Sequence, residues 1–586
     1  MVKLLRFLKP KEWAFFLINV VFISIQVFLD LRIPDYMSKI TTILNKQGEV
    51  SEIIAIGIKM VVCALGSLAS AIVCGYFAAK IAATFGMRLR GTVFHRVQEF
   101  SKEEIKQFST DSLITRSTND ITQIQMVMAM GAQLMIKAPI MAVWAILKIY
   151  NKNWQWSTTT LIAVVIMLVM IAIIAVFAIP RFKKVQKLTD DLNRVTRENL
   201  TGIRVVRAYN AEEYQENKFY IANDNLTKNN MFTGRLMGMI NPMMRILING
   251  ISLAIYWIGA YLILNAGAMM EKGVIFSNMV VFSSYAMQVV MSFMMLTIIF
   301  IMMPRAQVSA NRINEVLNTV PNITDGKIEK AENNVGEVEF KNVSFKYPDA
   351  EENVLEDINF KVRPGETLAL IGSTGSGKST IVDLIPRFYD VTEGEVLVNG
   401  INVKDYNLNS LNDYIGYVPQ KAILISGTIR SNIVYGDNGK GEIIEESVKK
   451  ALSIAQASEF VDKLEDGENA YVAQGGSNYS GGQKQRISIA RAIARDPEIY
   501  IFDDSFSALD LKTDKRLREA LSRETGHATN IIVSQRVSSI KNADKILVME
   551  EGKVVGYGKH EELIKNCKVY QEIAQSQLSQ EELNEK

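Results

Sequence analysis

The chain has 586 residues, of which 48% are hydrophobic and 22% are charged. A single hydrophobic core rarely grows beyond about 250–300 residues, so this length predicts two large units. The net charge of +3 comes without a basic stripe or tail, which argues against a nucleic-acid-binding protein. The three cysteines have no spacing typical of a metal site or of a disulfide framework.

The first half of the chain consists of long apolar stretches. A bilayer-spanning helix needs roughly 20 mostly apolar residues. Residues 1–306 contain six such stretches: Trp13–Ile33, Ile53–Tyr76, Ile121–Tyr150, Thr158–Ile179, Met231–Leu264 and Gly273–Met303. No small-residue cleavage site follows the first stretch, so we expect a retained membrane helix there and not a signal peptide. The sequence therefore predicts an α-helical membrane domain with six transmembrane helices.

Positive charge predicts the orientation of these spans. Lysine and arginine cluster before the first span, between the second and third, and after the fourth, within residues 3–11, 88–106 and 181–187. With six spans, the three clusters fall on one side, and an excess of lysine and arginine marks the cytoplasmic side. The segments Ala82–Asn119 and Arg181–Asn230 are charged but helical in pattern. We expect a multi-pass protein of the plasma (inner) membrane, with both termini and the second half of the chain in the cytoplasm.

Four charged residues lie inside the apolar runs: Asp30, Arg32, Lys137 and Arg245. Charges within a membrane are costly and usually face a cavity or a partner. Two interpretations stay open. One is a functional role in such a cavity, and the other is an Asp–Arg pair or snorkelling near a helix end.

Methionine is abundant in the same half, for instance at Met243 and Met244. Flexible thioethers suit a cavity that accepts many apolar shapes. Ordinary packing between helices or against lipid is the more common role for methionine, and the sequence alone does not separate the two.

The second half of the chain has the charge density of a soluble domain. We expect a connector over residues 307–333 and a soluble α/β domain over residues 334–586. Short runs rich in β-branched and aromatic residues predict its first strands. These runs are Val338–Phe340, Val343–Phe345, Ile358–Val362 and Thr367–Leu370.

A glycine-rich loop follows the last of these runs. It reads Gly372-Ser373-Thr374-Gly375-Ser376-Gly377-Lys378-Ser379, and a helical pattern begins at Thr380. This matches G-x-x-x-x-G-K-[ST] between a strand and a helix. Backbone N–H groups of such a loop bind phosphates, the lysine adds a positive charge, and the Ser379 hydroxyl can ligate Mg²⁺. The sequence predicts an ATP-binding loop over these residues.

A second apolar run, Ile499–Phe502, ends at Asp503. The plain alternative is a core strand that happens to stop at an acid. In a phosphate-loop domain, however, a carboxylate at this place holds Mg²⁺ directly or through its water shell. We therefore expect Asp503 to complete the metal site together with Ser379.

The string Tyr479-Ser480-Gly481-Gly482-Gln483-Lys484-Gln485-Arg486 resembles the signature motif of ABC ATPases. The resemblance implies that two ATPase domains sandwich two ATP molecules. Each ATP then contacts the phosphate loop of one domain and, in trans, the signature residues of the other, here Ser480, Gly481, Gly482 and Gln483. Tyr347 resembles the aromatic residue that stacks on adenine. Gln420 resembles the glutamine that contacts Mg²⁺ and the membrane domain.

With six spans ahead of such a domain, the whole chain resembles a half-transporter of the ABC exporter family. The segment Gly202–Asn210 resembles the cytoplasmic segment before that family's second coupling helix. The resemblance implies a type I exporter membrane domain (type IV fold) fused to an α/β phosphate-loop ABC ATPase domain. It also implies an ATP-hydrolysing translocase with ATP and Mg²⁺ as cofactors, in a lipid bilayer.

The chain departs from the family pattern at two positions. Asp504 stands where the family has a glutamate that polarises the attacking water, and Gln535 stands where it has a histidine that contacts the γ-phosphate. Aspartate draws the carboxylate back by about 1 Å, and such a misplacement can cost about 10²-fold in rate. Glutamine donates a hydrogen bond but carries no imidazolium charge. Neutral drift in a working enzyme is the alternative to a site that binds ATP and hydrolyses it poorly.

An intact signature is useful only if the site on the opposite domain works. We therefore expect a heterodimer. Its second ABC half-transporter would have both the glutamate that polarises water and the histidine that contacts the γ-phosphate, which is called the switch histidine. The expected function is ATP-driven export of amphipathic small molecules, with the multidrug type taken from the resemblance. The alternatives are a lipid, peptide or haem/thiol transporter, a homodimeric exporter with slow hydrolysis, and a regulator that transports nothing.

Overall fold

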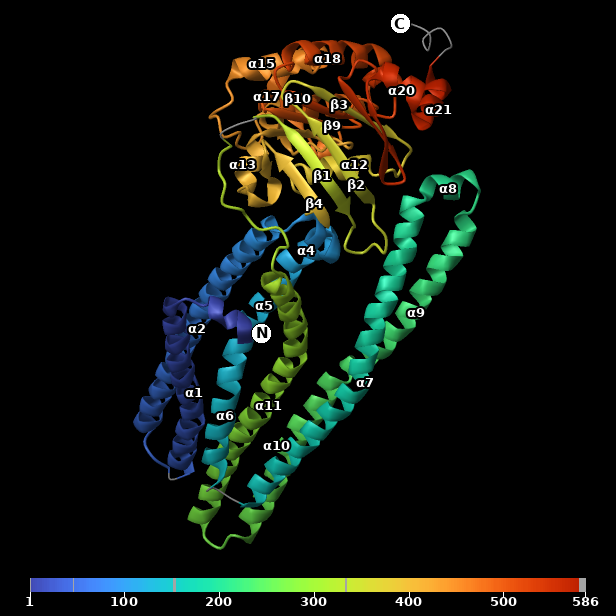
Figure 1. Cartoon of the computed structure of the whole chain (residues 1–586). Coiled ribbons are helices and arrows are strands. Elements are labelled where there is room, and N and C mark those ends of the chain that lie inside the picture. Colours follow the sequence, from blue (N-terminus) through green and yellow to red (C-terminus); the bar gives the residue numbers. More distant parts are fainter. Residues whose placement is uncertain (1, 46, 151–153, 332–334, 579–586) are drawn as a thin grey trace. The chain divides into compact units, whose positions relative to one another are not determined.

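The computed structural model describes residues 2–45, 47–150, 154–331 and 335–578 (Figure 1). The chain divides into two compact units. The helical unit comprises residues 1–98 and 111–319, and the sheet unit comprises residues 99–110 and 320–586. The expected domain borders after residues 306 and 333 remain a prediction, and residues 332–334 lie outside the described ranges.

The helical unit is built from helices, most of which are long (Figure 1). They are α1 (Pro10–Asn45), α2 (Val50–Gln98), α4 (Thr110–Ser117), α5 (Asn119–Met126), α6 (Ala132–Tyr150), α7 (Trp154–Thr201), α8 (Ile203–Ala208), α9 (Glu212–Gly238), α10 (Ile240–Asn265) and α11 (Met269–Asn318). Six helical segments of the described residues are long and apolar enough to cross a membrane. The predicted number of spans is confirmed.

These helices are longer than a bilayer requires. α7 has 48 residues and is therefore about 72 Å long at 1.5 Å per residue. The hydrocarbon core of a bilayer is only about 30 Å thick. The apolar helices therefore continue into charged segments that lie beyond the membrane.

Two of the four charges inside the apolar runs are paired between helices. The carboxylate of Asp30 on α1 lies 3.6 Å from the ammonium of Lys137 on α6. It also accepts a hydrogen bond from the hydroxyl of Ser67 on α2. The guanidinium of Arg32 lies 4.9 Å from the ring centre of Phe28. The structure thus pairs Asp30 with a lysine of another helix, whereas the Asp–Arg pair was one part of the second interpretation.

A second pair joins the same two helices. Asp35 of α1 lies 2.6 Å from Lys148 of α6, and the hydroxyl of Tyr285 on α11 also donates to Asp35. The two α1–α6 pairs neutralise charges that would be costly to bury alone. They fix the register of α1 against α6.

The sheet unit contains a four-stranded sheet in the order β2-β1-β4-β5, a six-stranded sheet in the order β12-β11-β3-β10-β9-β6, and the small ribbon β7-β8. The strands are β1 (Val338–Phe345), β2 (Leu355–Val362), β3 (Thr367–Gly372), β4 (Glu393–Val398), β5 (Ile401–Asn402), β6 (Ile415–Val418), β7 (Gly427–Thr428), β8 (Tyr471–Val472), β9 (Ile499–Asp503), β10 (Thr529–Val533), β11 (Lys545–Glu550) and β12 (Lys553–Gly558).

The helices of this unit are α3 (Lys102–Phe108), α12 (Lys378–Leu384), α13 (Leu408–Asp413), α14 (Ile429–Ile433), α15 (Glu445–Ile454), α16 (Ser458–Val461), α17 (Gly481–Ala494), α18 (Leu511–Glu524), α19 (Val537–Ile540), α20 (His560–Asn566) and α21 (Lys568–Gln577). The two runs expected at 338–340 and 343–345 form the single strand β1. A register shift between Phe340 and Val343 marks a bulge there, where Asn342 adopts a φ of +47°. The extra residue interrupts the alternation, which explains why the sequence shows two runs.

The neighbouring strands β3, β10, β9 and β6 are parallel. Parallel neighbours end at the same edge of a sheet, so the loops that follow them lie side by side. The loop after β3 is the glycine-rich loop, Asp504 follows β9, Gln535 follows β10, and Gln420 follows β6. The topology therefore gathers the predicted site residues at one edge.

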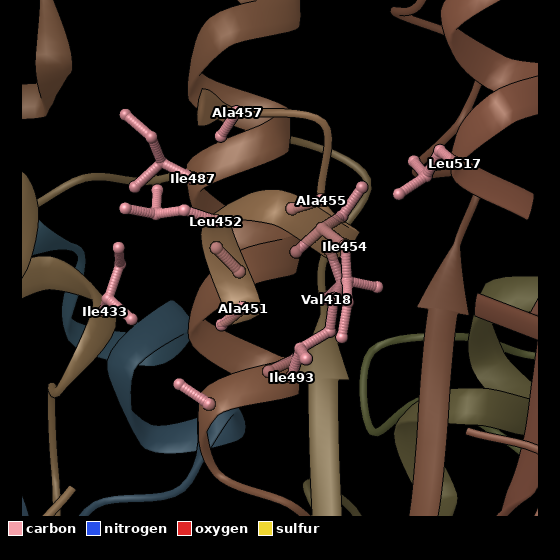
Figure 2. Close-up of a cluster of buried hydrophobic side chains, with 14 of the residues drawn as sticks. Val418, Ile433, Ala451, Leu452, Ile454, Ala455, Ala457, Ile487, Ile493 and Leu517 are labelled. Atoms are coloured by element: carbon pink, nitrogen blue, oxygen red, sulfur yellow. The ribbon is translucent and has the colours of Figure 1, made fainter. Parts of the chain in front are cut away.

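Buried side chains hold this arrangement in place. One cluster packs α14, α15, α17 and α18 against β6 and β9. Figure 2 shows part of it, with Val418 of β6 close to Ile454 and Ile493. A second cluster includes residues of both large sheets and of α12. Since α12 begins at the glycine-rich loop, packing of this helix fixes the position of the loop.

The Asp30–Lys137 pair makes a prediction for the stability of the helical unit. Lys137→Met should lower the thermal unfolding temperature because it leaves a carboxylate without its cation in an apolar bundle. Removing one partner of a buried pair costs about 3–5 kcal/mol, and this partly exposed pair should cost less. The double variant Asp30→Asn/Lys137→Met should recover most of the loss.

Thermal unfolding of the purified chain in detergent measures this effect. A double variant that is less stable than Lys137→Met alone would contradict the prediction.

Candidate functional site

The glycine-rich loop joins β3 to α12 through backbone conformations that only glycine adopts readily. Gly377 has a φ of +95°. A Cβ atom at this residue would lie 2.6 Å from the side chain of Leu355 and 3.2 Å from the carbonyl of Val354. Both the conformation and the packing therefore exclude a side chain here. The first turn of α12 is left with its N–H groups available to an anion.

Lys378 lies at the centre of this loop. Its ammonium donates to the carbonyls of Gly372 at 2.9 Å and Ser373 at 2.6 Å, and to the hydroxyl of Ser376 at 3.2 Å. Burial lowers the pKa of Lys378, while the carboxylates of Asp504 and Asp503 act in the opposite direction. The loop thus holds a positive charge where the phosphates of a nucleotide would meet it.

Ser379 and Asp503 meet although 124 positions separate them. The hydroxyl of Ser379 donates to the carboxylate of Asp503 at 2.9 Å. Asp503 is 5% exposed, and burial raises its pKa, an effect that the Ser379 hydrogen bond partly offsets.

These oxygens suit Mg²⁺, which usually binds one or two carboxylates together with phosphate oxygens of the substrate. Within the described ranges, no group of three or more His, Cys, Asp and Glu side chains is arranged to hold a metal. The Ser379 hydroxyl and the Asp503 carboxylate together fit an ion that shares its coordination with the phosphate oxygens of a nucleotide.

Asp504 follows the strand in a strained conformation. Its φ is +46°, which is uncommon for a residue other than glycine and costs about 1–3 kcal/mol. One carboxylate oxygen accepts a hydrogen bond from the Gln535 amide at 3.2 Å and lies 3.5 Å from the Gln420 amide nitrogen. Burial is the main cause that raises the pKa of Asp504. The structure thus brings together the three residues that follow β9, β10 and β6.

Tyr347, the expected adenine-stacking residue, lies next to the same helix. Its hydroxyl is 3.1 Å from the hydroxyl of Thr380. Its ring meets the rings of Tyr389 and Phe345 edge to face, with ring centres 5.3 Å and 4.8 Å apart. These contacts hold Tyr347 close to α12, while its stacking role remains a prediction.

The signature residues Ser480–Gln483 form the N-terminus of α17. The backbone N–H of Ser480 donates to the side chain of Gln483, and the N–H of Gln483 donates to the hydroxyl of Ser480. This reciprocal pair is a capping box. In the part of the chain that the structure describes, no hydrogen bond joins these residues to the glycine-rich loop. Their use in trans remains a prediction.

The structure adds a contact that the sequence analysis missed. The ammonium of Lys102 on α3 lies 2.8 Å and 2.9 Å from the two carboxylate oxygens of Asp383 on α12. The hydroxyl of Tyr417 on β6 donates to the same carboxylate at 3.2 Å. Four residues further along α3, Lys106 forms an ion pair with Asp349 at 2.6 Å. Helix α3 therefore contacts the helix of the glycine-rich loop and the loop that follows Tyr347.

In the sequence, Lys102 and Lys106 belong to the basic cluster that predicts the orientation of the spans, and nothing there indicates a contact with the nucleotide site. A spacing of four residues places both on one face of a helix. The spacing does not reveal their partners, which lie 281 and 243 positions away.

Comparison with known families supports the reading of both units. Residues 16–303 match the model of the ABC transporter transmembrane region, and residues 355–507 match the model of the ABC transporter. The fold is similar to the structure of a bacterial Atm1-family ABC exporter with ATP bound. That likeness has a TM-score of 0.80 and 22% sequence identity, and it covers 97% of this chain and 100% of the other.

Relatives extend over nearly the whole length. An uncharacterized ABC transporter ATP-binding protein of Mycobacterium tuberculosis is 38% identical over 94% of each chain. Another from Bacillus subtilis is 33% identical over 99% of each chain. An ATP-dependent lipid A-core flippase of Syntrophus aciditrophicus is 30% identical over 87% of this chain and 84% of its own. The chain belongs to the ABC transporter family, as an exporter-type half-transporter that binds and hydrolyses ATP to drive transport through a multi-pass membrane domain.

Proposed function

We propose that this chain is one half of a heterodimeric exporter and carries the weaker of its two hydrolytic sites. The observation that carries the proposal is the pairing of Asp504 with Gln535, where the family pattern has a glutamate and a histidine. Residues that the family pattern assigns to the nucleotide and its metal are present at the same edge of the sheet, namely Lys378, Ser379, Asp503 and Gln420. We therefore propose that bound ATP survives longer at this site than at a complete site, where it is hydrolysed.

The geometry supports slow chemistry in two ways. The carboxylate of Asp504 is one methylene shorter than that of glutamate, so it stands further from an attacking water, and misplacement by about 1 Å can cost about 10²-fold in rate. One of its oxygens is also engaged by the Gln535 amide. The amide of Gln535 is neutral and does not titrate, so it places no positive charge on the γ-phosphate. A general base in this position is both retracted and occupied.

Binding is supported by the groups that remain. Lys378 supplies a positive charge within the loop, and Ser379, Asp503 and Gln420 would hold Mg²⁺. When bound, Mg²⁺ supplies charge that neutralises the phosphates. Tyr347 would stack on the adenine. We propose that the bound ATP acts mainly as a clamp between two ATPase domains.

The intact signature supports a second half-transporter as partner. Ser480, Gly481, Gly482 and Gln483 would act on the ATP held by the partner's phosphate loop. Such a site works fully only if the partner has the glutamate and the histidine that this chain lacks. A homodimer would contain two weak sites, whereas in a heterodimer the intact signature motif of this chain would complete a working site of the partner.

An apolar groove in the helical unit supports amphipathic cargo. It lies between α7 and α10, has a volume of about 420 Å³, and is lined by residues that include Ile162, Met170, Met243, Ile246 and Gly250. Met243 therefore faces this groove, whereas Met244 is buried in the helix core. Flexible thioethers let such a surface fit apolar groups of different shapes.

The basic clusters support a cytoplasmic position of the ATPase domain at the plasma membrane.

Lipid transport is a second candidate for the same groove. Relatives include ATP-dependent lipid A-core flippases at 29–30% identity, and an apolar groove also accommodates acyl chains. We expect efflux of hydrophobic dyes in cells that express the chain with its partner, and little flipping of labelled lipid in proteoliposomes. Rapid lipid flipping without dye efflux would favour the lipid transporter.

The weak-site proposal predicts the turnover of the chain alone. Purified without a partner, it should bind Mg-ATP but hydrolyse it about 10²-fold more slowly than a complete exporter, because of the retracted carboxylate. The double substitution Asp504→Glu/Gln535→His should raise turnover by at least about tenfold, since it restores the base and a group able to carry charge. Lys378→Ala should abolish ATP binding in both backgrounds.

ATPase turnover in nanodiscs measures all of these variants. Fast turnover of the unmodified chain would contradict the weak site and would indicate a homodimeric exporter.

A further inference from the structure

The loop after β10, residues 534–537, is called the switch loop here, and it is held by the last residue of α21. The side-chain amide of Gln577 donates to the backbone carbonyl of Gln535 at 2.7 Å. The side-chain oxygen of Gln577 accepts from the backbone N–H of Val537 at 2.9 Å. One side chain therefore binds the backbone on both sides of Arg536.

The position of Gln577 is set by the packing of its helix. Tyr570 and Ala574 of α21 are fully buried, in the same cluster as Val537 of the switch loop and Ala369 and Ile371 of β3. The hydroxyl of Tyr570 lies 2.6 Å from Nδ1 of His560 on α20. Close-packed interiors allow little displacement, so Gln577 presents its amide to the switch loop from a fixed support.

The same loop carries the group that engages Asp504. The backbone carbonyl of Gln535 accepts from Gln577. The side-chain amide of Gln535 donates to the carboxylate of Asp504 at 3.2 Å. The backbone N–H of Asp504 donates to the carbonyl of Val533, at the end of β10, at 3.1 Å. The contacts thus form a continuous series from α21, through the switch loop, to the carboxylate of Asp504.

We propose that Gln577 is a positioning residue for ATP hydrolysis. It holds the switch loop so that the amide of Gln535 lies on Asp504, and it thereby links the C-terminal helix to the hydrolytic group. The inference rests on the proposed function for the roles of Asp504 and Gln535. It adds that a residue outside the nucleotide site controls their geometry.

A purely structural role for Gln577 would produce different mutational effects. Two partly exposed hydrogen bonds would then add stability, and their loss would lower the unfolding temperature without regard to Gln535. A positioning role acts only through Gln535, so its effect disappears when that side chain is removed. Residues that act through a shared partner have non-additive effects, which a double-mutant cycle detects.

The test uses the full-length chain in nanodiscs. Single-turnover hydrolysis of labelled Mg-ATP, with protein in excess, is compared for the unmodified chain, Gln577→Ala, Gln535→Ala and the double variant. Gln575→Ala is the matched control, because Gln575 is an exposed residue of the same helix. Gln577→Glu is a milder variant that keeps the acceptor for Val537 and loses the donor to Gln535. Unfolding temperature and ATP affinity are measured for each protein.

We expect Gln577→Ala to speed hydrolysis about threefold to tenfold, because the loss of one or two hydrogen bonds loosens the switch loop and lets the Gln535 amide release the Asp504 carboxylate. ATP affinity should stay within about twofold, because the groups that bind phosphate are unchanged. Gln577→Glu should give an intermediate rate, and Gln575→Ala should match the unmodified chain. The double variant should be no faster than Gln535→Ala.

Three results would overturn the inference: effects on the rate that multiply in the double variant, an unchanged or slower rate in Gln577→Ala, or a rate change that only follows the unfolding temperature. The proposed function can fail separately. If the unmodified chain hydrolyses ATP rapidly, the weak site is refuted, while the four-protein comparison still decides the role of Gln577.

Discussion

The parallel pairing of β3, β10, β9 and β6 is the constraint on which the site depends. A common direction brings four loops to one edge, although their residues lie far apart in the chain. Ser379 can then reach Asp503, and Gln535 can reach Asp504. Reversing any of these strands would separate the groups that bind phosphate from those that act on it.

The sequence predicted those parts of the structure that local patterns encode. The glycine-rich loop, Asp503 and the six apolar spans each follow from residues close together in the chain. The partners of Asp30, Lys102 and Gln577 could not be predicted, because each contact depends on two helices or loops that only the fold brings together. The bulge in β1 was missed because an extra residue disrupts the alternation on which strand prediction depends.

Two sets of contacts reach the nucleotide site, one through α12 and one through the switch loop. Lys102 binds Asp383 at one end of α12, and the glycine-rich loop lies at the other end of this short helix. In the chain, α3 lies between α2, which ends at Gln98, and α4, which begins at Thr110. Gln577 approaches the site through the switch loop. The proposed weak site is thus a complete binding site whose hydrolytic group is held by amides instead of being free to act on water.

If the site is weak, ATP bound to this chain stays intact, and the fate of the bound nucleotide can be followed on the protein itself. The chain is loaded with labelled Mg-ATP, freed of unbound nucleotide, and analysed over time for ATP and ADP on the protein. We expect ATP to remain the main species at least about tenfold longer than in the Asp504→Glu/Gln535→His variant, because the base is misplaced. Conversion to ADP at the same rate in both proteins would show that the site is not weak.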